Sequence, residues 1–244
     1  MADGLKIRAD DEALVEAALR RFATSPAALA RLAAGVKGLT SVPRGRQLLA
    51  EGERTANVTI LCQGVAKCYR GLARAGQQTL ALFVPGDMLD IDAFLLGRAS
   101  AAVGAITPLR VAQIEHAAFS DAIDAHPEIG WSLWRAMARE RALVQEWLLG
   151  LGRRQALART AHLICEIAAR FSHGDGLKEV VDFPLTQVEL ADLLGLSAVH
   201  VNRVLQQLRA EGLIDLARGR LAIRDRAKLV ATADFDPTYL GGGL

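Results

Sequence analysis

The sequence predicts an α+β protein in which an N-terminal β-roll, a long helix and a C-terminal winged helix-turn-helix follow one another. Three observations predict this order: short apolar runs broken by glycine turns from 39 to 114, a heptad-like pattern after Pro127, and two short amphipathic helices on either side of Gly195. With 244 residues, 51% of them hydrophobic, the chain suits one large domain or two small ones.

Composition narrows the class of protein. The formal net charge is only +2 and aromatic residues make up 5%, so this is not a basic nucleic-acid coat protein. The charged N-terminus contains no signal-peptide core, and no run of about eighteen apolar residues predicts a membrane span. Cys62, Cys68 and Cys165 are odd in number and scattered, which indicates buried thiols in a reducing cytoplasm. We expect Cys62 and Cys68 in one strand, about 20 Å apart, too far for a disulfide.

The first half of the chain predicts helices followed by strands. Residues 11–35 are rich in alanine and leucine, with an interruption at Ser25-Pro26. From 39 to 114, several short β-like runs are separated by turn signals such as Glu51-Gly52-Glu53 and Pro85-Gly86-Asp87, which favours an all-β barrel or sandwich. A short helix is expected over 119–125. We assign residues 1–126 to these helices and the β-domain.

A long helix is expected from Pro127 to about Gly152, because proline suits the first turn of a helix. Its apolar positions alternate in steps of four and three, a heptad-like seam that pairs helices. The predicted dimer interface therefore consists of Leu133, Met137, Glu140, Val144, Trp147 and Leu151. The alternative is a helix packed on its own domain. Trp131 and Trp134 are expected to pack against the β-domain.

The end of this helix is expected to form a hinge, and a DNA-binding part follows. Residues 150–154 (GLGRR) are the predicted hinge, so the dimerisation helix and hinge cover 127–154. A helix over 155–171 opens the winged-helix domain, assigned to 155–235, with a loop at 172–176. Residues 236–244 are expected to be a flexible tail.

The most informative stretch is 183–209. Thr186 and Glu189 have capping-box spacing before a helix over 187–194, and Ser197 suits the N-cap of a second helix over 198–209. Gly195 between them can adopt positive φ without steric cost. The apolar spacing would pack the two helices together, the pattern of a DNA-binding helix-turn-helix. The alternative is a helical hairpin in an unrelated core. Two apolar runs around Arg218-Gly219-Arg220 then predict a β-hairpin, the wing.

The predicted helix-turn-helix suggests a role in DNA binding for each side chain on its exposed face. Arg203 is the best base reader, because its fork matches O6 and N7 of guanine. Asn202 can contact adenine, His200 a base edge or a phosphate, and Val199 at most a thymine methyl, unless Val199 packs on the wing. The phosphate contacts are expected from Thr186, Gln187 and Ser197, with Arg218 and Arg220 at the wing tip. The full predicted DNA-binding set is Thr186, Gln187, Ser197, Ala198, Val199, His200, Asn202, Arg203, Gln206, Arg218 and Arg220.

The order of elements resembles the Crp/Fnr family of bacterial transcription regulators. LTQVELADLLGLSAVHVNRVLQQLRAEGLI is similar to the family's helix-turn-helix almost position for position, and FVPGDM is similar to its cyclic-nucleotide-binding-like jelly roll. The resemblance implies a homodimer on a palindromic operator, a sensor domain and RNA polymerase as a partner. It also implies that Arg203 reads guanine, and that Val199 stands where many members carry a base-reading glutamate.

The chain departs from the family at the effector site. Cyclic-AMP-binding relatives carry Gly-Glu after FxxGD and then Arg-Ser; here the matching pairs are Asp90-Ile91 and Ala99-Ser100. Without the cationic partner a buried phosphate is costly, so ordinary cyclic AMP is not the expected effector. An unknown effector is assigned to Gly86, Asp90, Ile91, Ala99 and Ser100. A constitutive binder controlled by its abundance is the alternative.

No cofactor is expected. The iron–sulfur relatives use several N-terminal cysteines, and this chain has none before Cys62. Haem on His116 or His126, and a metal at Asp87, Asp90 and Asp92, lack a set of partners. We find no enzyme-like nucleophile with a paired base. The alternative function is a small-molecule-sensing β-roll protein whose DNA binding is weak or vestigial.

Overall fold

The computed structural model describes residues 9–73, 76–171 and 179–241. It divides into two compact units: residues up to Gly71 with Leu80–Ala138, and Leu72–Thr79 with Arg139 onward. The long helix α5 (Pro127–Arg153) contributes to both, so the boundary falls inside the helix rather than at either of its ends. The loop expected at 172–176 lies outside the described residues.

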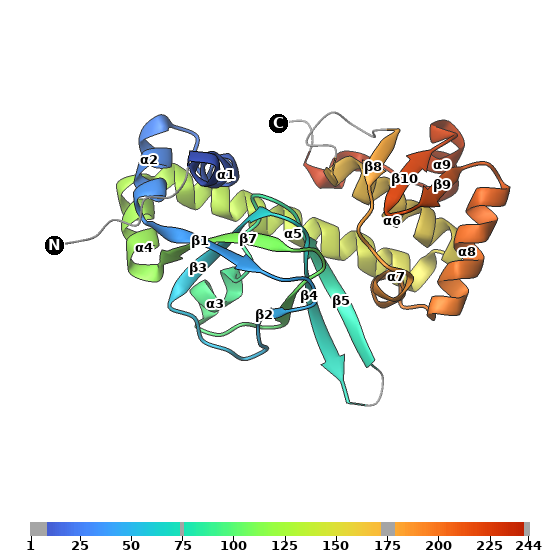
Figure 1. Cartoon of the computed structure of the whole chain (residues 1–244), viewed down its shortest axis with the longest axis horizontal. Helices are drawn as coiled ribbons and strands as arrows, with labels where there is room; N and C mark the ends of the chain where they lie inside the picture. Colours follow the sequence, from blue (N-terminus) through green and yellow to red (C-terminus); the bar gives the residue numbers. More distant parts are fainter. Residues whose placement is uncertain (1–8, 74–75, 172–178, 242–244) are drawn as a thin grey trace. The chain divides into compact units, whose positions relative to one another are not determined.

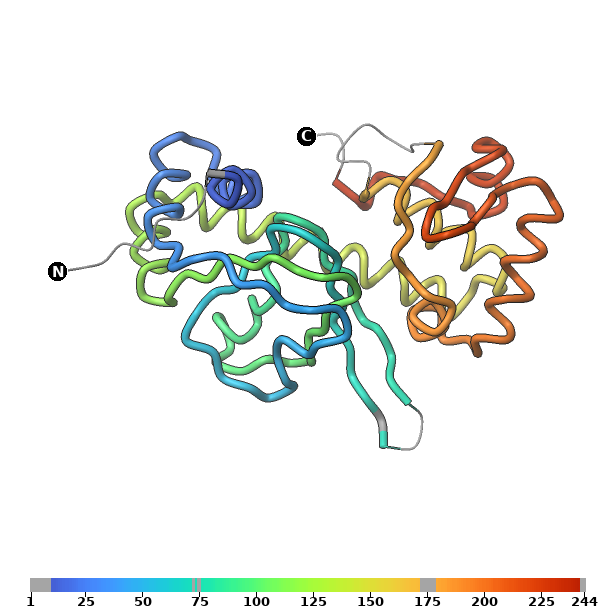
Figure 2. Tube along the Cα trace, viewed as in Figure 1, coloured from blue at the N-terminus to red at the C-terminus, as the bar shows by residue number. Residues whose placement is uncertain are grey.

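A roll of two antiparallel sheets makes up most of the first unit, with strand orders β1-β7-β3 and β2-β6-β4-β5. Figure 1 labels most of these strands, and Figure 2 traces the same stretch of chain in blue and green. In the first sheet β7 pairs with both neighbours, with Ile114 opposite Val36 on one side and Val58 on the other. The strands are β1 (Val36–Val42), β2 (Gln47–Leu49), β3 (Asn57–Gln63), β4 (Ala66–Leu72), β5 (Gly76–Phe83), β6 (Ala102–Ala105) and β7 (Leu109–Glu115).

Helices cover the outer face of the β1-β7-β3 sheet. The helices of this unit are α1 (Ala9–Leu19), α2 (Pro26–Ala34), α3 (Ile91–Leu96) and α4 (His116–Ala125), and α1 and α4 both contact β3. Ser25 caps α2 by accepting a hydrogen bond from Ala28 N, which explains the break expected at Ser25-Pro26. Because β3 is buried on both faces, Val58 and Ile60 pack under the helices while Leu61 fills the roll.

The placement of two cysteines was predicted wrongly. Cys62 lies near the end of β3 and Cys68 lies in β4, so the two residues are in consecutive strands rather than in one. Between them Gly64 has φ +94°, and a Cβ there would stand 2.4 Å from Pro108 O, so only glycine fits this turn. Cys62, Cys68 and Cys165 form no disulfide bond. Burial raises the pKa of Cys62 to about 11 and that of Cys165 to about 12, which makes both poor thiolates.

The second unit contains a winged helix. Its elements are α6 (Ala156–Phe171), β8 (Val180–Asp182), α7 (Gln187–Leu194), α8 (Ala198–Ala210), β9 (Ile214–Ala217), β10 (Arg220–Ile223), α9 (Arg226–Ala233) and the 3-10 helix η1 (Pro237–Leu240). The helices predicted over 187–194 and 198–209 are found almost residue for residue. The wing gains a strand that was not predicted, because β8 pairs with β10 in the order β8-β10-β9.

The structure corrects the predicted hinge and the predicted flexible tail. α5 continues to Arg153 and α6 begins at Ala156, so most of the GLGRR segment is helical and only Arg154 and Gln155 separate the helices. Residues 237–240 form η1 rather than a flexible tail. Across the described ranges, no helix combines the length and the apolarity needed to cross a membrane.

Candidate nucleic-acid interface

Caps fix where both helices of the helix-turn-helix begin. Thr186 Oγ1 accepts from Glu189 N at 3.2 Å while a Glu189 carboxylate oxygen accepts from Thr186 N at 2.6 Å, the reciprocal capping box that the spacing predicted. Ser197 Oγ accepts from His200 N at 3.2 Å and caps α8. Gly195 between the helices has φ +60°. Since both hydroxyl oxygens accept from the backbone, their protons stay available to donate to a phosphate.

Packing against α7 decides which face of α8 is presented to solvent. The buried residues recur at helical spacing and include Ala191, whose small side chain lets the helices approach. They are Leu190, Ala191, Leu193 and Leu194 in α7, and Val201, Val204, Leu205 and Leu208 in α8. The remaining face of α8 does not pack in the core and is available for contact with a partner.

The exposed face of α8 carries the residues predicted to read bases. His200, Arg203 and Gln206 are exposed, whereas Ala198 and Asn202 are half-buried. Val199 is 74% exposed, which excludes the alternative that it packs on the wing. A shallow hollow of about 420 Å³ is lined by Gln187, Ala198, Val199, Asn202 and Arg203.

One pair within this face is already bonded. Asn202 Nδ2 donates to Gln187 Oε1 at 3.1 Å, so the N-terminal end of α7 and the middle of α8 are joined across the hollow. Any contact of Asn202 with an adenine requires that this hydrogen bond be exchanged or kept by the second amide proton. Gln187, which was predicted to contact a phosphate, thus lies beside the exposed face of α8.

The wing presents its arginines at a tight turn. Arg218 and Gly219 both have positive φ, +51° and +74°, which places a two-residue turn between β9 and β10. Arg218 and Arg220 are exposed, and Arg220 Nε lies 4.0 Å from the exposed Asp182 carboxylate. Arg209 was not predicted as structural, but it donates to Leu216 O at 2.7 Å and fastens the wing to α8.

The apolar seam exposed on α5 differs from the predicted dimer interface by one residue at three of the six positions. Leu133 is 3% exposed in the core of the first unit, and Trp147 donates to Glu166, so neither presents its side chain to a partner. Trp131 and Trp134, expected to be packed, are 60% and 64% exposed. The exposed residues with alternating steps of three and four are Trp134, Met137, Arg141, Val144, Leu148 and Leu151.

The structure does not bring the five predicted effector residues together. Gly86 stands against Arg21, Ile91 packs towards the helices, and Ala99 lies in the interior of the roll. Ser100 N donates to Asp92 at 2.5 Å. Only Asp90 lines a cavity of about 250 Å³, with residues that were not predicted: Leu48, Leu49, Glu53, Arg54, Thr55, Ala56, Asn57, Thr59, Leu89 and Gln113.

The acidic residues at this end of the roll have protein partners. Asp87 pairs with Arg21, and Asp90 accepts from Thr59 N at 2.8 Å. Burial raises the pKa of Asp90 to about 6. Among the described residues, no group of three or more His, Cys, Asp and Glu could hold a metal ion.

Two family models match this chain in the order of its two units. A cyclic nucleotide-binding domain matches residues 39–126, and a Crp-like helix-turn-helix domain matches residues 158–232. The chain belongs to the Crp/Fnr family. Regulation of transcription through a DNA-binding helix-turn-helix follows from that membership.

Relatives of this Crp/Fnr chain extend over most of its length. It is 29% identical over 224 residues to the CRP-like cAMP-activated global transcriptional regulator of Mycobacterium tuberculosis, covering 91% of this chain and 99% of that protein. It is 26% identical over 189 residues to the nitrogen fixation regulation protein FixK of Bradyrhizobium diazoefficiens, covering 78% and 79%.

Solved structures of the Crp/Fnr family share the fold. FixK2 from Bradyrhizobium japonicum aligns with a TM-score of 0.71 at 23% identity, covering 80% of this chain and 96% of that one. A CRP-family transcriptional regulator from Thermus thermophilus aligns with a TM-score of 0.65 at 24% identity, covering 80% and 97%. At these identities the likeness concerns the fold alone.

Proposed function

We propose that this Crp/Fnr regulator binds a palindromic operator as a homodimer, with one α8 helix in the major groove of each half-site. The observation that carries the proposal is the face of α8, where Val199, His200, Arg203 and Gln206 are exposed beside the capped start of α7. A helix of 13 residues with one buried side suits insertion of the other side into the groove.

Base reading and phosphate contact are divided between these residues. Arg203 reads guanine through O6 and N7. Val199 stands where many family members carry a base-reading glutamate, and it can make only an apolar contact with a base. Thr186, Gln187 and Ser197 at the helix starts, with Arg218 and Arg220 at the wing, contact phosphates and set the position of the helix. We propose RNA polymerase as a further protein partner.

The exposed seam of α5 supports the dimer. Met137, Val144, Leu148 and Leu151 are between 39% and 69% exposed, an arrangement that is costly in water for one chain. Their spacing matches alternating a and d positions, which pair two parallel helices. A second copy of this chain buries the stripe and presents two α8 helices related by two-fold symmetry.

Selection from a random DNA pool with purified protein and no added ligand tests this function. We expect enrichment of a two-fold symmetric sequence with a guanine in each half. The R203A variant, run in parallel, should lose the preference for that guanine. Absence of any enriched sequence, both without ligand and with cyclic nucleotides or cell extract added, would contradict the proposal and favour a sensing protein with vestigial DNA binding.

The effector, if one acts, is not an ordinary cyclic nucleotide. Asp92 accepts hydrogen bonds from Ala93 N at 2.9 Å and Ser100 N at 2.5 Å, so the Ser100 N–H is already bonded to a carboxylate of the protein. The negative charge of Asp92 would also repel the phosphate of a cyclic nucleotide. Ala99 supplies no cation. Cyclic AMP should therefore leave the melting temperature unchanged. A clear upward shift, abolished in the A99E variant, would overturn this part of the proposal.

A further inference from the structure

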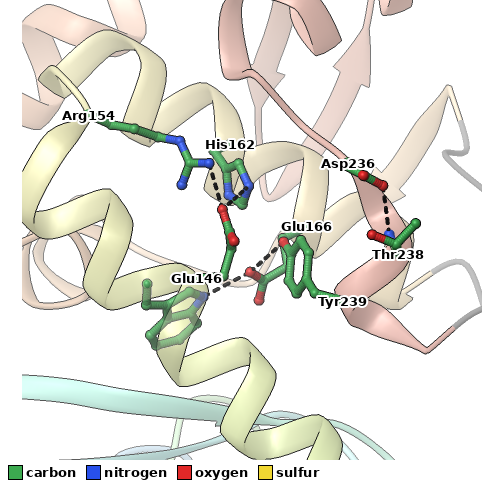
Figure 3. A network of polar contacts seen from close by, with 8 residues as sticks. Glu146, Arg154, His162, Glu166, Asp236, Thr238 and Tyr239 are labelled. Carbon is green, nitrogen blue, oxygen red and sulfur yellow. Dashed lines mark hydrogen bonds and ion pairs between the residues drawn. The ribbon is translucent and has the colours of Figure 1, made fainter.

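A buried glutamate joins three elements of the second unit. Glu166 of α6 is fully buried and accepts from Trp147 Nε1 of α5 at 2.8 Å and from Arg170 Nη1 at 3.2 Å. It also accepts from the Tyr239 hydroxyl of η1 at 3.1 Å (Figure 3). A buried carboxylate is costly unless it is well hydrogen-bonded. Each donor therefore matters, and two of the three come from outside α6.

A second cluster lies beside the first and shares Tyr239. Glu146 pairs with Arg154 at 2.5 Å, and the same carboxylate oxygen lies 3.2 Å from His162 Nε2, as Figure 3 shows. The His162 ring stacks on the Tyr239 ring at 5.8 Å and meets the edge of Phe235 at 5.2 Å. Two neighbouring residues of α5, Glu146 and Trp147, thus reach α6, and the C-terminal segment packs over both contacts.

The C-terminal segment from Phe235 to Tyr239 is held in place by burial and hydrogen bonds. Phe235 is 7% exposed and its N–H donates to Val230 O. Asp236 caps η1 by accepting from Thr238 N at 2.9 Å. The matched helix-turn-helix model ends at residue 232, so Phe235 and Tyr239 lie beyond the residues that it matches. We call Phe235–Tyr239 the C-terminal strap.

The strap packs on the α6 residues that contact α5, close in sequence to the break between the two helices. Arg154 and Gln155 separate α5 from α6, and Arg159 of α6 donates to Leu151 O at 3.2 Å near the end of α5. A change of angle at this break would separate Trp147 from Glu166 and Glu146 from His162. With Tyr239 packed over the site, water cannot easily replace the lost donors, so such a change is strongly opposed.

We propose that the C-terminal strap is a positioning element for DNA recognition: through Tyr239 and Glu166 it fixes the angle between α5 and the winged helix. The inference rests on the proposed dimer, because in a dimer paired through α5 this angle sets the separation of the two α8 helices. The strap then determines which half-site spacing the protein accepts. Tyr239 acts through Glu166 and does not touch DNA.

The test compares operators that share both half-sites but differ in the spacer by one or two base pairs. The full chain is used with Y239F, which removes the hydroxyl and keeps the ring on His162. The matched control is Y69F, which removes the chain's other tyrosine hydroxyl, an exposed donor to Gln47 in the β-roll. We expect Y239F to lose on the order of tenfold in discrimination between spacings, the scale set by one hydrogen bond to a buried charge.

Binding to a single half-site should be equal in wild type, Y239F and Y69F, because α8 is unchanged. E166Q, which removes the charge without changing the size of the side chain, should reproduce the loss even if Y239F folds poorly. Wild-type spacing preference in both Y239F and E166Q would overturn the proposal. Failure of wild type to prefer paired half-sites at all would instead overturn the proposed dimeric function.

Discussion

Arg203 stands out at the residue scale because it is exposed on α8 and its guanidinium can bond a guanine at two points. We expect R203A to cost about 1–3 kcal/mol of binding free energy at one guanine per half-site, and little at other positions. The measurement is fluorescence anisotropy on operators with single base changes.

R218A provides the contrast on the same domain. A wing arginine that meets a phosphate should weaken binding to all sequences alike and reduce the salt slope by about one unit. Equal base-independent losses in both variants would show that Arg203 contacts only the backbone, and the recognition-face assignment would be wrong.

His162 gives a prediction for stability against pH. Burial, with Arg154 nearby, lowers its pKa from 6.5 to about 4. Its folded-state pKa is depressed, so the neutral ring favours the folded state above pH 6.5. This contribution is lost as the pH falls from 6.5 towards 4, and amounts to at most about 3 kcal/mol.

Other groups titrate in the opposite sense. Burial raises the pKa of Asp90 to about 6 and also raises that of Glu166, so their effect is to reduce stability as the pH rises. The informative quantity is therefore the difference in unfolding free energy between wild type and H162Q, measured by urea denaturation from pH 4 to 8. The slope of the wild type should exceed that of H162Q between pH 4 and 6.5. Parallel curves would contradict the account of His162.

At the scale of elements, α5 is the helix with two apolar faces. The predicted seam and the exposed seam share positions 137, 144 and 151. They differ by one residue at the other three positions, and both sets fit the same heptad-like spacing, so the sequence alone does not distinguish them. The deciding facts are tertiary, because Leu133 fills the core of the first unit and Trp147 bonds Glu166.

L148E tests the corrected seam. Leu148 is 69% exposed at an a position, so a glutamate there would place two like charges together in the dimer and split it. L149E is the matched control, since Leu149 is also exposed but lies outside the a and d positions. Sedimentation should give a monomer for L148E and a dimer for wild type and L149E. A dimeric L148E would exclude this face as the interface.

Local signals explain which elements could be predicted. The capping box of Thr186 and Glu189 and the positive-φ Gly195 specify the helix-turn-helix within about ten residues, and the structure has it at those positions. The strap was missed because a proline and terminal glycines indicate disorder, while its order depends on Phe235 and Tyr239 meeting His162 and Glu166, about 70 residues earlier in the chain.

The effector residues were predicted less well for a related reason. Gly86, Ile91 and Ala99 are near one another in sequence. Gly86 and Ala99 lie in the loops on either side of α3, and Ile91 begins α3, so the three face Arg21, the roll interior and the helices respectively. The cavity beside Asp90 is lined mainly by β3 and the loop before it, where the sequence indicated only a turn at Glu51-Gly52-Glu53.

For the whole molecule, the central claim is that two copies of α8 read a two-fold symmetric operator. The most direct measurement compares binding of wild type to an inverted repeat, a direct repeat and a single copy of the selected half-site, at one salt concentration. The account predicts tightest binding to the inverted repeat, with two chains per duplex. Equal affinity for the direct repeat, or for the single half-site, would contradict it.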